Sequence, residues 1–375
     1  MEFKINNDYF NKAISDVSKA VSTKTTVPLL SGIKIIAQPD RITVVGSNGD
    51  IAIERTLPLI GEGNKMIEVY SPGRVVVSAK YISDIIKKLP YDIYIKVSDN
   101  QSVTIKSGDI TTKLNGIDGS DFPELPKFDV HHSITMSSED LIGIIKDTVF
   151  ATSKNETRPV LTGVNFTFEE DVLTCVATNS HRLALRKYRM KSPLRGSFIV
   201  PSSSLIELSK LFGGHKANLE IYTSENNIMF KSNNLSFYSR LIDGTYPNVA
   251  GLIPEDTSTI LTLDTRELLK GIDRASLFAS EWKNNNIVFQ ITDESKIRIS
   301  SNSSEMGQIE EIQHVKTISG AKDLTISLDG NFMMDALKAI RDEEVKLCFN
   351  GTMRPILILP VGNDTQLQLI SPVRS

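Results

Sequence analysis

The side chains that most often perform catalysis are few and scattered along this chain of 375 residues. His181 lies beside Ser180, but adjacent residues in a strand or tight loop project apart and rarely form a nucleophile and its base. Cys175 and Cys348 lie inside strand-like runs, where a buried thiol is expected. The sequence contains no nucleotide-binding glycine loop, zinc-binding spacing or nucleophile elbow. We therefore expect no catalytic residue, no metal and no cofactor, although a triad assembled from distant residues stays open.

Lysine and arginine recur on the polar faces of six predicted amphipathic helices. The first is expected to begin at Asn7 or Asp8, and its Lys12 and Lys19 lie opposite an apolar stripe with helical spacing. The chain has 42 basic against 45 acidic residues and a net charge of −3, so any basic surface must be local. An ordinary solvated face is the alternative, and Asp147 near one of these faces weakens the pattern.

These helices belong to a repeated unit. Segment 28–50 aligns without a gap on 159–181, carrying Gly32 onto Gly163, and a fainter third copy begins near Asn285. Each copy runs from a short strand into a helix, alternating strands, a second helix and more strands. Repeats of this length are whole domains. We predict an α+β fold of three tandem domains, 1–126, 127–253 and 254–375, with helices on one face of antiparallel sheets.

The composition is that of a folded globular protein, with 40% hydrophobic and 23% charged residues. The first residues contain no apolar signal-peptide region, and no window is apolar for long enough to span a membrane. We expect a cytoplasmic protein with no membrane partner.

Five ordered motifs closely resemble those of the bacterial β sliding clamp family, the processivity subunits of DNA polymerase III, especially the Gram-positive type. They are ETRPVLTGV (156–164), ATNSHRLAL (177–185), SRLIDGTYP (239–247), DALKAI (335–340) and GTMRP (351–355). The resemblance implies a clamp fold in which two subunits meet head to tail in a six-domain ring around duplex DNA. It also implies a processivity factor at the nucleoid that is not an enzyme. A divergent paralogue, or a protein-interaction scaffold that does not encircle DNA, is the alternative.

The helix cations fit this resemblance, because lysine and arginine near phosphates bind duplex DNA without reading its sequence. The family adds inner-loop contacts at three motif positions, Lys24, Asn155 and Arg158. The predicted DNA-binding residues are Lys12, Lys19, Lys24, Lys80, Lys87, Lys88, Lys146, Asn155, Arg158, Lys210, Lys270, Arg274, Lys338 and Arg341.

The resemblance also implies a groove that accepts short peptides from the replicative polymerase, the clamp loader, and repair and ligation proteins. Its residues by motif are Leu161, Thr178, His181, Arg182, Leu183, Pro247, Leu252, Phe332, Met353, Pro355, Ile370, Pro372, Val373 and Arg374. Exposed methionine suits a surface that accepts several partners. Three departures from the family, Gly251, Ser371 and the additional Ser375, are expected to weaken or re-tune peptide affinity.

Closure of the ring needs a homodimer interface. By position, Ile85 and Leu89 of one subunit are expected to meet Leu277 and Phe278 of the other. Leu277 falls away from the apolar stripe of its helix, where a large apolar residue is costly in a monomer. Edge strands around Lys106 and Ser300 are expected to pair across this interface. Packing beneath a neighbouring loop is the alternative for these apolar side chains.

Overall fold

The computed structural model describes residues 1–22, 25, 27–61, 63–129, 133–192, 195–214, 216–254, 256–279, 285–321 and 323–373. Its contacts divide the chain into two compact units. The first unit comprises Met1–Leu141 and Ser203–Leu241, and the second comprises Ile142–Ser202 and Ile242–Ser375. The predicted limits 1–126, 127–253 and 254–375 follow the sequence repeats, and they stay a prediction.

An antiparallel sheet of thirteen strands dominates the first unit. In spatial order its strands are β12 (Ser133–Ser137), β17 (Asn218–Thr223), β18 (Asn227–Ser232), β19 (Leu235–Arg240), β4 (Ile51–Pro58), β3 (Arg41–Ser47), β2 (Gly32–Gln38), β8 (Gly73–Ser78), β11 (Ile110–Ile117), β10 (Ser102–Ser107), β9 (Ile93–Val97), β1 (Glu2–Ile5) and β7 (Ile67–Ser71). A small hairpin joins β5 (Ile60–Gly61) to β6 (Asn64–Lys65).

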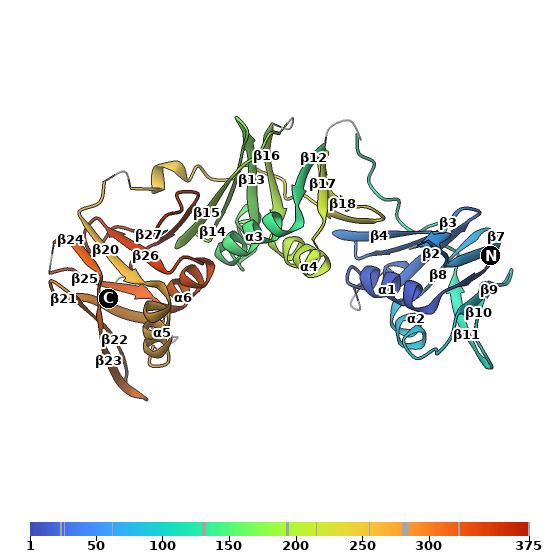
Figure 1. The fold of residues 1–375 in the computed structure, drawn as a ribbon, viewed down its shortest axis with the longest axis horizontal. Coiled ribbons are helices and arrows are strands. Elements are labelled where there is room, and N and C mark those ends of the chain that lie inside the picture. Colours follow the sequence, from blue (N-terminus) through green and yellow to red (C-terminus); the bar gives the residue numbers. More distant parts are fainter. Residues whose placement is uncertain are drawn as a thin grey trace. The chain divides into compact units, whose positions relative to one another are not determined.

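Two helices, α1 (Asn7–Ser18) and α2 (Ala79–Ile86), lie on one face of this sheet over β2, β3, β4 and β8 (Figure 1). The apolar stripe of α1 is buried as its spacing predicts, with Phe10, Ile14 and Val17 in the core. The helix begins at Asn7, as expected, although the capping residue is Asn6, whose side chain accepts a hydrogen bond from the Tyr9 amide. The remaining elements of this part are α4 (Ser202–Phe212) and the 3-10 turn η1 (Pro28–Ser31).

The second unit contains a nine-stranded and a four-stranded antiparallel sheet. The larger sheet has the order β16 (Gly196–Pro201), β13 (Gly163–Glu169), β14 (Val172–Thr178), β15 (Arg182–Arg189), β28 (Gln366–Ile370), β27 (Ile356–Pro360), β26 (Glu344–Phe349), β20 (Thr259–Asp264) and β24 (Thr317–Gly320). The smaller has β23 (Gly307–His314), β22 (Lys296–Ser303), β21 (Asn286–Asp293) and β25 (Thr325–Asp329).

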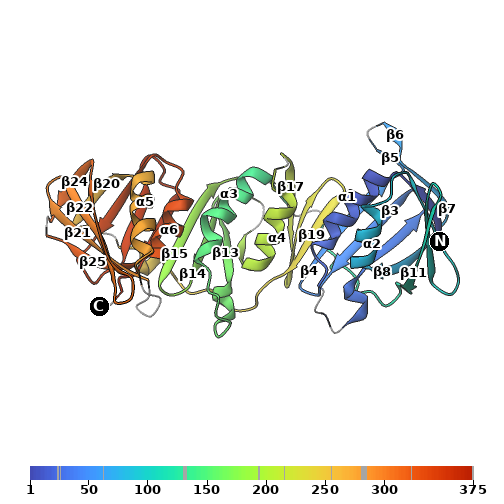
Figure 2. The same ribbon diagram turned by 90° about the horizontal axis from the view of Figure 1, so that it is seen from below.

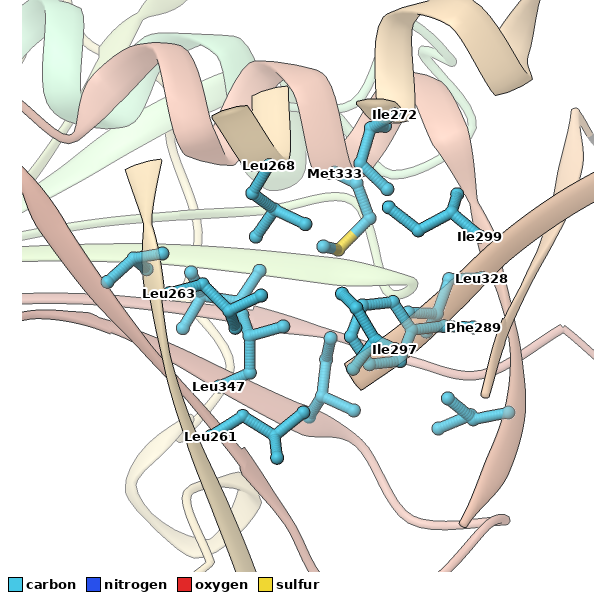
Figure 3. Packing of buried hydrophobic residues seen from close by; sticks show 14 of the residues in the cluster. Leu261, Leu263, Leu268, Ile272, Phe289, Ile297, Ile299, Leu328, Met333 and Leu347 are labelled. Carbon is cyan, nitrogen blue, oxygen red and sulfur yellow. The ribbon is translucent and has the colours of Figure 1, made fainter. Parts of the chain in front are cut away.

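Two helices of this unit, α5 (Thr265–Ser276) and α6 (Gly330–Ala339), pack side by side (Figure 2). Figure 3 shows Leu268 of α5 and Met333 of α6 in one buried cluster with Phe289 and Leu347 from the strands. The helix α3 (Ser138–Thr148) precedes β13, and the 3-10 turns are η2 (Val149–Ala151), η3 (Pro159–Thr162) and η4 (Ala250–Leu252). Apolar residues at helical and alternating spacing thus converge on one core, as the sequence predicts.

The sequence repeat is reproduced strand by strand. One constant offset, which carries Gly32 onto Gly163, also carries both ends of η1, β2, β3 and β4 onto those of η3, β13, β14 and β15. The sequence similarity fades after Asp50, but the structural register continues to the end of β4. Ile51 and Arg182, which are chemically unlike, therefore occupy equivalent first positions of β4 and β15.

No helix in the described part of the chain is long and apolar enough to cross a membrane.

Candidate functional site

A cleft of about 800 Å³ opens in the second unit beside the start of α6. Its walls come from the loop 152–158, the turn 179–182 and the first turns of α6. Four predicted groove residues line it, namely Leu161, His181, Arg182 and Phe332. Three predicted DNA-binding residues, Asn155, Arg158 and Lys338, line the same cleft. The two sets, which we predicted separately, therefore meet in one cleft.

The side chain of Arg182 is held in this cleft by several contacts, and only 8% of the residue is exposed. Its Nη1 donates to Oδ2 of Asp335 at 2.7 Å, and its Nη2 donates to the carbonyl of Phe150. The guanidinium also lies 4.4 Å from the centroid of the Phe332 ring. A buried guanidinium needs such partners, since an unpaired charge is costly away from water. Arg182 consequently positions Phe332 and α6 and is committed to contacts within the chain.

The turn before Arg182 is shaped by its own side chains. Oδ1 of Asn179 accepts from the amides of His181 and Arg182 at 3.0 Å each. The hydroxyl of Thr178 donates to the Arg182 carbonyl at 2.7 Å. Ser180 has a positive φ of 76°, which such a tight turn requires and which is uncommon for a residue with a side chain. These local bonds leave the His181 side chain exposed at the edge of the cleft.

An apolar wall stands beside this turn. Leu183 belongs to a buried cluster against which Tyr246, Val249 and Ile253 pack. The Tyr246 hydroxyl accepts from the Thr178 amide at 3.0 Å, and burial raises the pKa of Tyr246 well above its usual value. The segment 246–253 is therefore anchored to the turn. It leaves two predicted groove residues exposed, Pro247 and Leu252, the latter by 53%.

The C-terminal strand completes the same region. In the pairing of β15 with β28, Ile370 lies opposite Arg182. The amide of Ser371 donates to the His181 carbonyl at 2.8 Å. Pro355, Pro372 and Val373 are half-buried there, which leaves part of each surface accessible. Arg374 and Ser375, which we also singled out from the sequence, lie outside the described residues.

Met353 stands apart from the other predicted groove residues. It lies in the loop between β26 and β27, is 65% exposed and is not among the residues that line the cleft. A methionine so exposed has no role in the core, so its position agrees with a contact surface.

The eleven predicted helix cations lie in the described residues and are exposed, but five of them are paired with carboxylates. The pairs are Lys19 with Asp16 at 3.7 Å, Lys210 with Glu207 at 2.7 Å, Lys270 with Glu267 at 2.9 Å, Arg274 with Glu311 at 2.7 Å and Arg341 with Asp147 at 3.4 Å. Within the described part of the chain, the cations with no ion pair are Lys12, Lys80, Lys87, Lys88, Lys146, Arg158 and Lys338. Lys24 lies outside the described residues.

The side chain of Asn155 stabilises its own loop, because its oxygen accepts a hydrogen bond from the Thr157 amide at 2.9 Å. Asn155 and Arg158 are both exposed and line the cleft. Both can contribute to an anion-binding loop, with Arg158 supplying the charge.

The environment of Asp147 differs from the one that the sequence predicts. We expected it near a polar helix face, but only 4% of it is exposed. Its carboxylate lies 3.6 Å from Nε of Arg186 and 3.4 Å from a guanidinium nitrogen of Arg341. Burial raises the pKa of Asp147, and the two guanidinium groups partly offset that rise. The helical pattern around Asp147 contains no signal for this, since Arg186 in β15 and Arg341 after α6 lie far from it along the chain.

The predicted dimer residues have mixed exposure. Leu277 follows α5 and is 67% exposed, whereas Phe278 and Ile85 are half-buried and Leu89 is buried. The expectation for edge strands is wrong, because Lys106 lies in β10 and Ser300 in β22, and both strands have a partner on each side. Among the described strands, free edges occur along 110–115 of β11 and along β23.

This architecture defines a class of protein, that of repeated α+β clamp domains with a binding cleft. Family models for the DNA polymerase III beta subunit match the chain over residues 1–126 for the N-terminal domain, 135–248 for the central domain and 250–374 for the C-terminal domain. The chain belongs to the family of DNA polymerase III beta subunits, the bacterial β sliding clamps. This confirms the resemblance, the α+β clamp fold in three tandem domains, and the expectation of a processivity factor rather than an enzyme.

Individual relatives agree with that membership over full length. The chain is 41% identical to the β sliding clamp of Bacillus subtilis and 39% identical to that of Staphylococcus aureus, with 100% of each chain covered. The crystal structure of the Bacillus subtilis clamp matches with a TM-score of 0.97, covering 100% of this chain and 99% of that one. The Streptococcus pyogenes beta subunit, 33% identical, matches with a TM-score of 0.94 over 100% of both chains. These relatives confirm the Gram-positive type.

Proposed function

We propose that two copies of this chain close head to tail into a ring that encircles duplex DNA and tethers the replicative polymerase to it. The observation that carries this proposal is the likeness to β sliding clamps over 100% of this chain. We further propose that the ring works in the cytoplasm, at the nucleoid, where its DNA lies.

Contact with DNA is assigned first to the cations without an ion pair in the described residues. Lys80, Lys87 and Lys88 belong to α2 or follow it directly, and Lys12 lies on α1, the helix packed beside it. Long flexible ammonium groups form weak, salt-sensitive phosphate contacts that permit sliding. Arg274 is a weaker candidate, because its bidentate pair with Glu311 must open before it can reach a phosphate.

Partner recognition is assigned to the cleft and its apolar wall. Leu161 and Leu183 form the buried base, and Leu252 offers an exposed apolar surface beside it. An apolar peptide tail would bury these side chains, while polar groups of the 178–182 turn would orient its anchor residue. The polymerase, the clamp loader, and repair and ligation proteins are the proposed partners.

Ring closure is assigned to the exposed Leu277 and to the free edges of β11 and β23. Both strands carry unpaired backbone groups and exposed apolar residues, Ile110 on β11 and Ile312 on β23. Such edges are ready to pair with another chain. The corrected edges replace those expected around Lys106 and Ser300.

Primer extension on circular single-stranded DNA, with the cognate polymerase and loader, tests the tethering function. Addition of this protein should lengthen the products made in one binding event. The double variant Leu252→Asp with Met353→Asp should lose that effect and remain folded, since both side chains are exposed. Ile60→Asp, another exposed apolar site, is the matched control and should behave as wild type. Unchanged products with wild-type protein would contradict the proposal.

A further inference from the structure

A second cleft, of about 630 Å³, lies in the first unit and has no role in the function proposed above. It is formed by the start of β4, the end of β19 and the segment 123–126. Residues from the first copy of the repeat, Asp50, Ile51 and Pro123, face residues from β19, Tyr238 and Arg240, across it.

The turn at this cleft is built in the same way as the 178–182 turn of the peptide groove. Oδ1 of Asn48 accepts from the amides of Asp50 and Ile51 at 3.0 and 2.9 Å, as Asn179 does in the second copy. The hydroxyl of Ser47 donates to the Ile51 carbonyl at 2.9 Å, as Thr178 does to Arg182. Gly49 supplies the positive φ, here 97°, that Ser180 supplies in the groove.

The neighbouring strand is placed equivalently too. Ala52 lies opposite Tyr238 between β4 and β19, just as Leu183 lies opposite Leu369 between β15 and β28. The amide of Arg240 donates to the Asp50 carbonyl at 2.9 Å, the counterpart of the bond from Ser371 to His181. The constant offset of the repeat relates every one of these positions. The first unit therefore carries a copy of the peptide groove in backbone geometry.

An apolar floor is also present. Ala52, Tyr222, Met229 and Tyr238 form a buried cluster, and Leu125 packs against it from the segment that follows Pro123. The packing of Leu125 here corresponds to the packing of the segment 246–253 against the buried cluster of Leu183 beside the peptide groove. An apolar side chain of a ligand could rest on this floor.

The charge of this cleft is opposite in sign to that of the peptide groove. Where the groove has His181 and Arg182, this cleft has Asp50 and Ile51, and the segment after Pro123 adds Glu124. Both carboxylates are exposed, and neither has an ion pair within the described residues. Glu124 lies near Lys34, where burial lowers the pKa of the ammonium group and the charge of Glu124 partly offsets that change. Arg240 is the one cation that lines the cleft, so carboxylates outnumber it.

We propose that this cleft is a second peptide-binding site, selective for a short extended peptide in which a lysine or arginine is flanked by apolar residues. The apolar residues rest on the floor around Ala52 and Tyr238, and the cation meets Asp50 and Glu124. The site does not depend on the encirclement of DNA, so its test is separate from that of the proposed function.

Fluorescence anisotropy with two labelled pentapeptides tests the site on the full-length protein. The basic probe is Leu-Lys-Leu-Phe-Gly, and the acidic probe is Leu-Glu-Leu-Phe-Gly. The basic probe should bind saturably below about 1 mM, and the acidic probe at least about fivefold more weakly. Asp50→Asn with Glu124→Gln should weaken the basic probe about fivefold, and Asp50→Lys should weaken it more than about tenfold.

Asp99→Asn removes an exposed carboxylate from the loop between β9 and β10, outside both clefts, and is the matched control, which should leave affinity for the basic probe unchanged. Thermal unfolding should show that all variants are folded. Absence of saturable binding by wild-type protein would overturn the proposal. So would equal binding of the two probes, an unchanged affinity in the Asp50 variants, or a loss of affinity in Asp99→Asn.

Discussion

At the scale of single residues, the groove depends on side chains that contact the chain itself. Arg182 was predicted as a groove residue, and the structure brings it to Asp335, Phe150 and Phe332, three partners that no local pattern indicates. The motif position of Arg182 can be taken from the sequence, and its role in a peptide groove stays a prediction. The contacts that fix its side chain were not predictable, since they join residues far apart along the chain.

Replacement of Arg182 by Met should lower the free energy of unfolding by about 1–3 kcal/mol. The change removes a charged hydrogen bond and leaves the Phe150 carbonyl and Asp335 without their partner. It should also weaken binding of a polymerase-tail peptide, because Phe332 loses the guanidinium beside its ring. Urea unfolding and a peptide titration measure the two effects. Arg189→Met, exposed at the other end of β15, is the control, and equal effects of both changes would refute this role.

Asp147 should make stability depend on pH in an unusual direction. Its pKa in the folded protein is raised above the ordinary 3.8 by burial, so the folded protein binds the proton more tightly than the unfolded chain. The contribution of Asp147 to stability is therefore full below pH 3.8 and is lost as the pH rises through the raised value. As the pH rises through that range, the unfolding midpoint of the wild-type protein should fall relative to that of Asp147→Asn. A pH-independent difference would contradict the raised pKa.

At the scale of elements, periodicity and repetition were reliable guides. The apolar stripes that predicted α1, α5 and α6 are the buried faces of these helices, and the aligned segments became equivalent strands. Edge strands were not predictable, because β10 and β22 alternate polar and apolar residues as an edge strand also does. The start of α1 at Asn7 was predicted, but its cap was not, since the Asn7 side chain donates to the Leu89 carbonyl and Asn6 caps the helix.

Leu277→Asp should convert the dimer to monomer while changing the stability of each subunit by less than about 0.5 kcal/mol. The side chain is 67% exposed in the single chain, so its apolar surface is unmatched until a second subunit covers it. Light scattering across a dilution series gives the mass. Ile206→Asp on α4, also an exposed apolar site on a helix, should leave the dimer intact. A dimer that survives Leu277→Asp would exclude this residue from the interface.

At the scale of the whole molecule, family membership and the overall negative charge together define how DNA is held. A net charge of −3 does not attract DNA, so affinity for DNA must come from the local helix cations.

The double variant Lys87→Gln with Lys88→Gln should bind DNA with a weaker dependence on salt. In a plot of the logarithm of DNA affinity against the logarithm of salt concentration, its slope should be shallower by about 2. Lys210→Gln is the control, because Lys210 is already paired with Glu207. Equal slopes in both variants would show that these two lysines do not contact phosphates.

Retention on DNA of one sequence, first as a closed circle and then after a single cut, tests the ring most directly. The protein is loaded on the circle, free protein is removed, and the bound fraction is followed in high salt before and after linearisation. Encirclement predicts that the bound protein stays on the circle for many minutes and leaves through the ends once the DNA is cut. Equal retention on cut and uncut DNA would contradict the account.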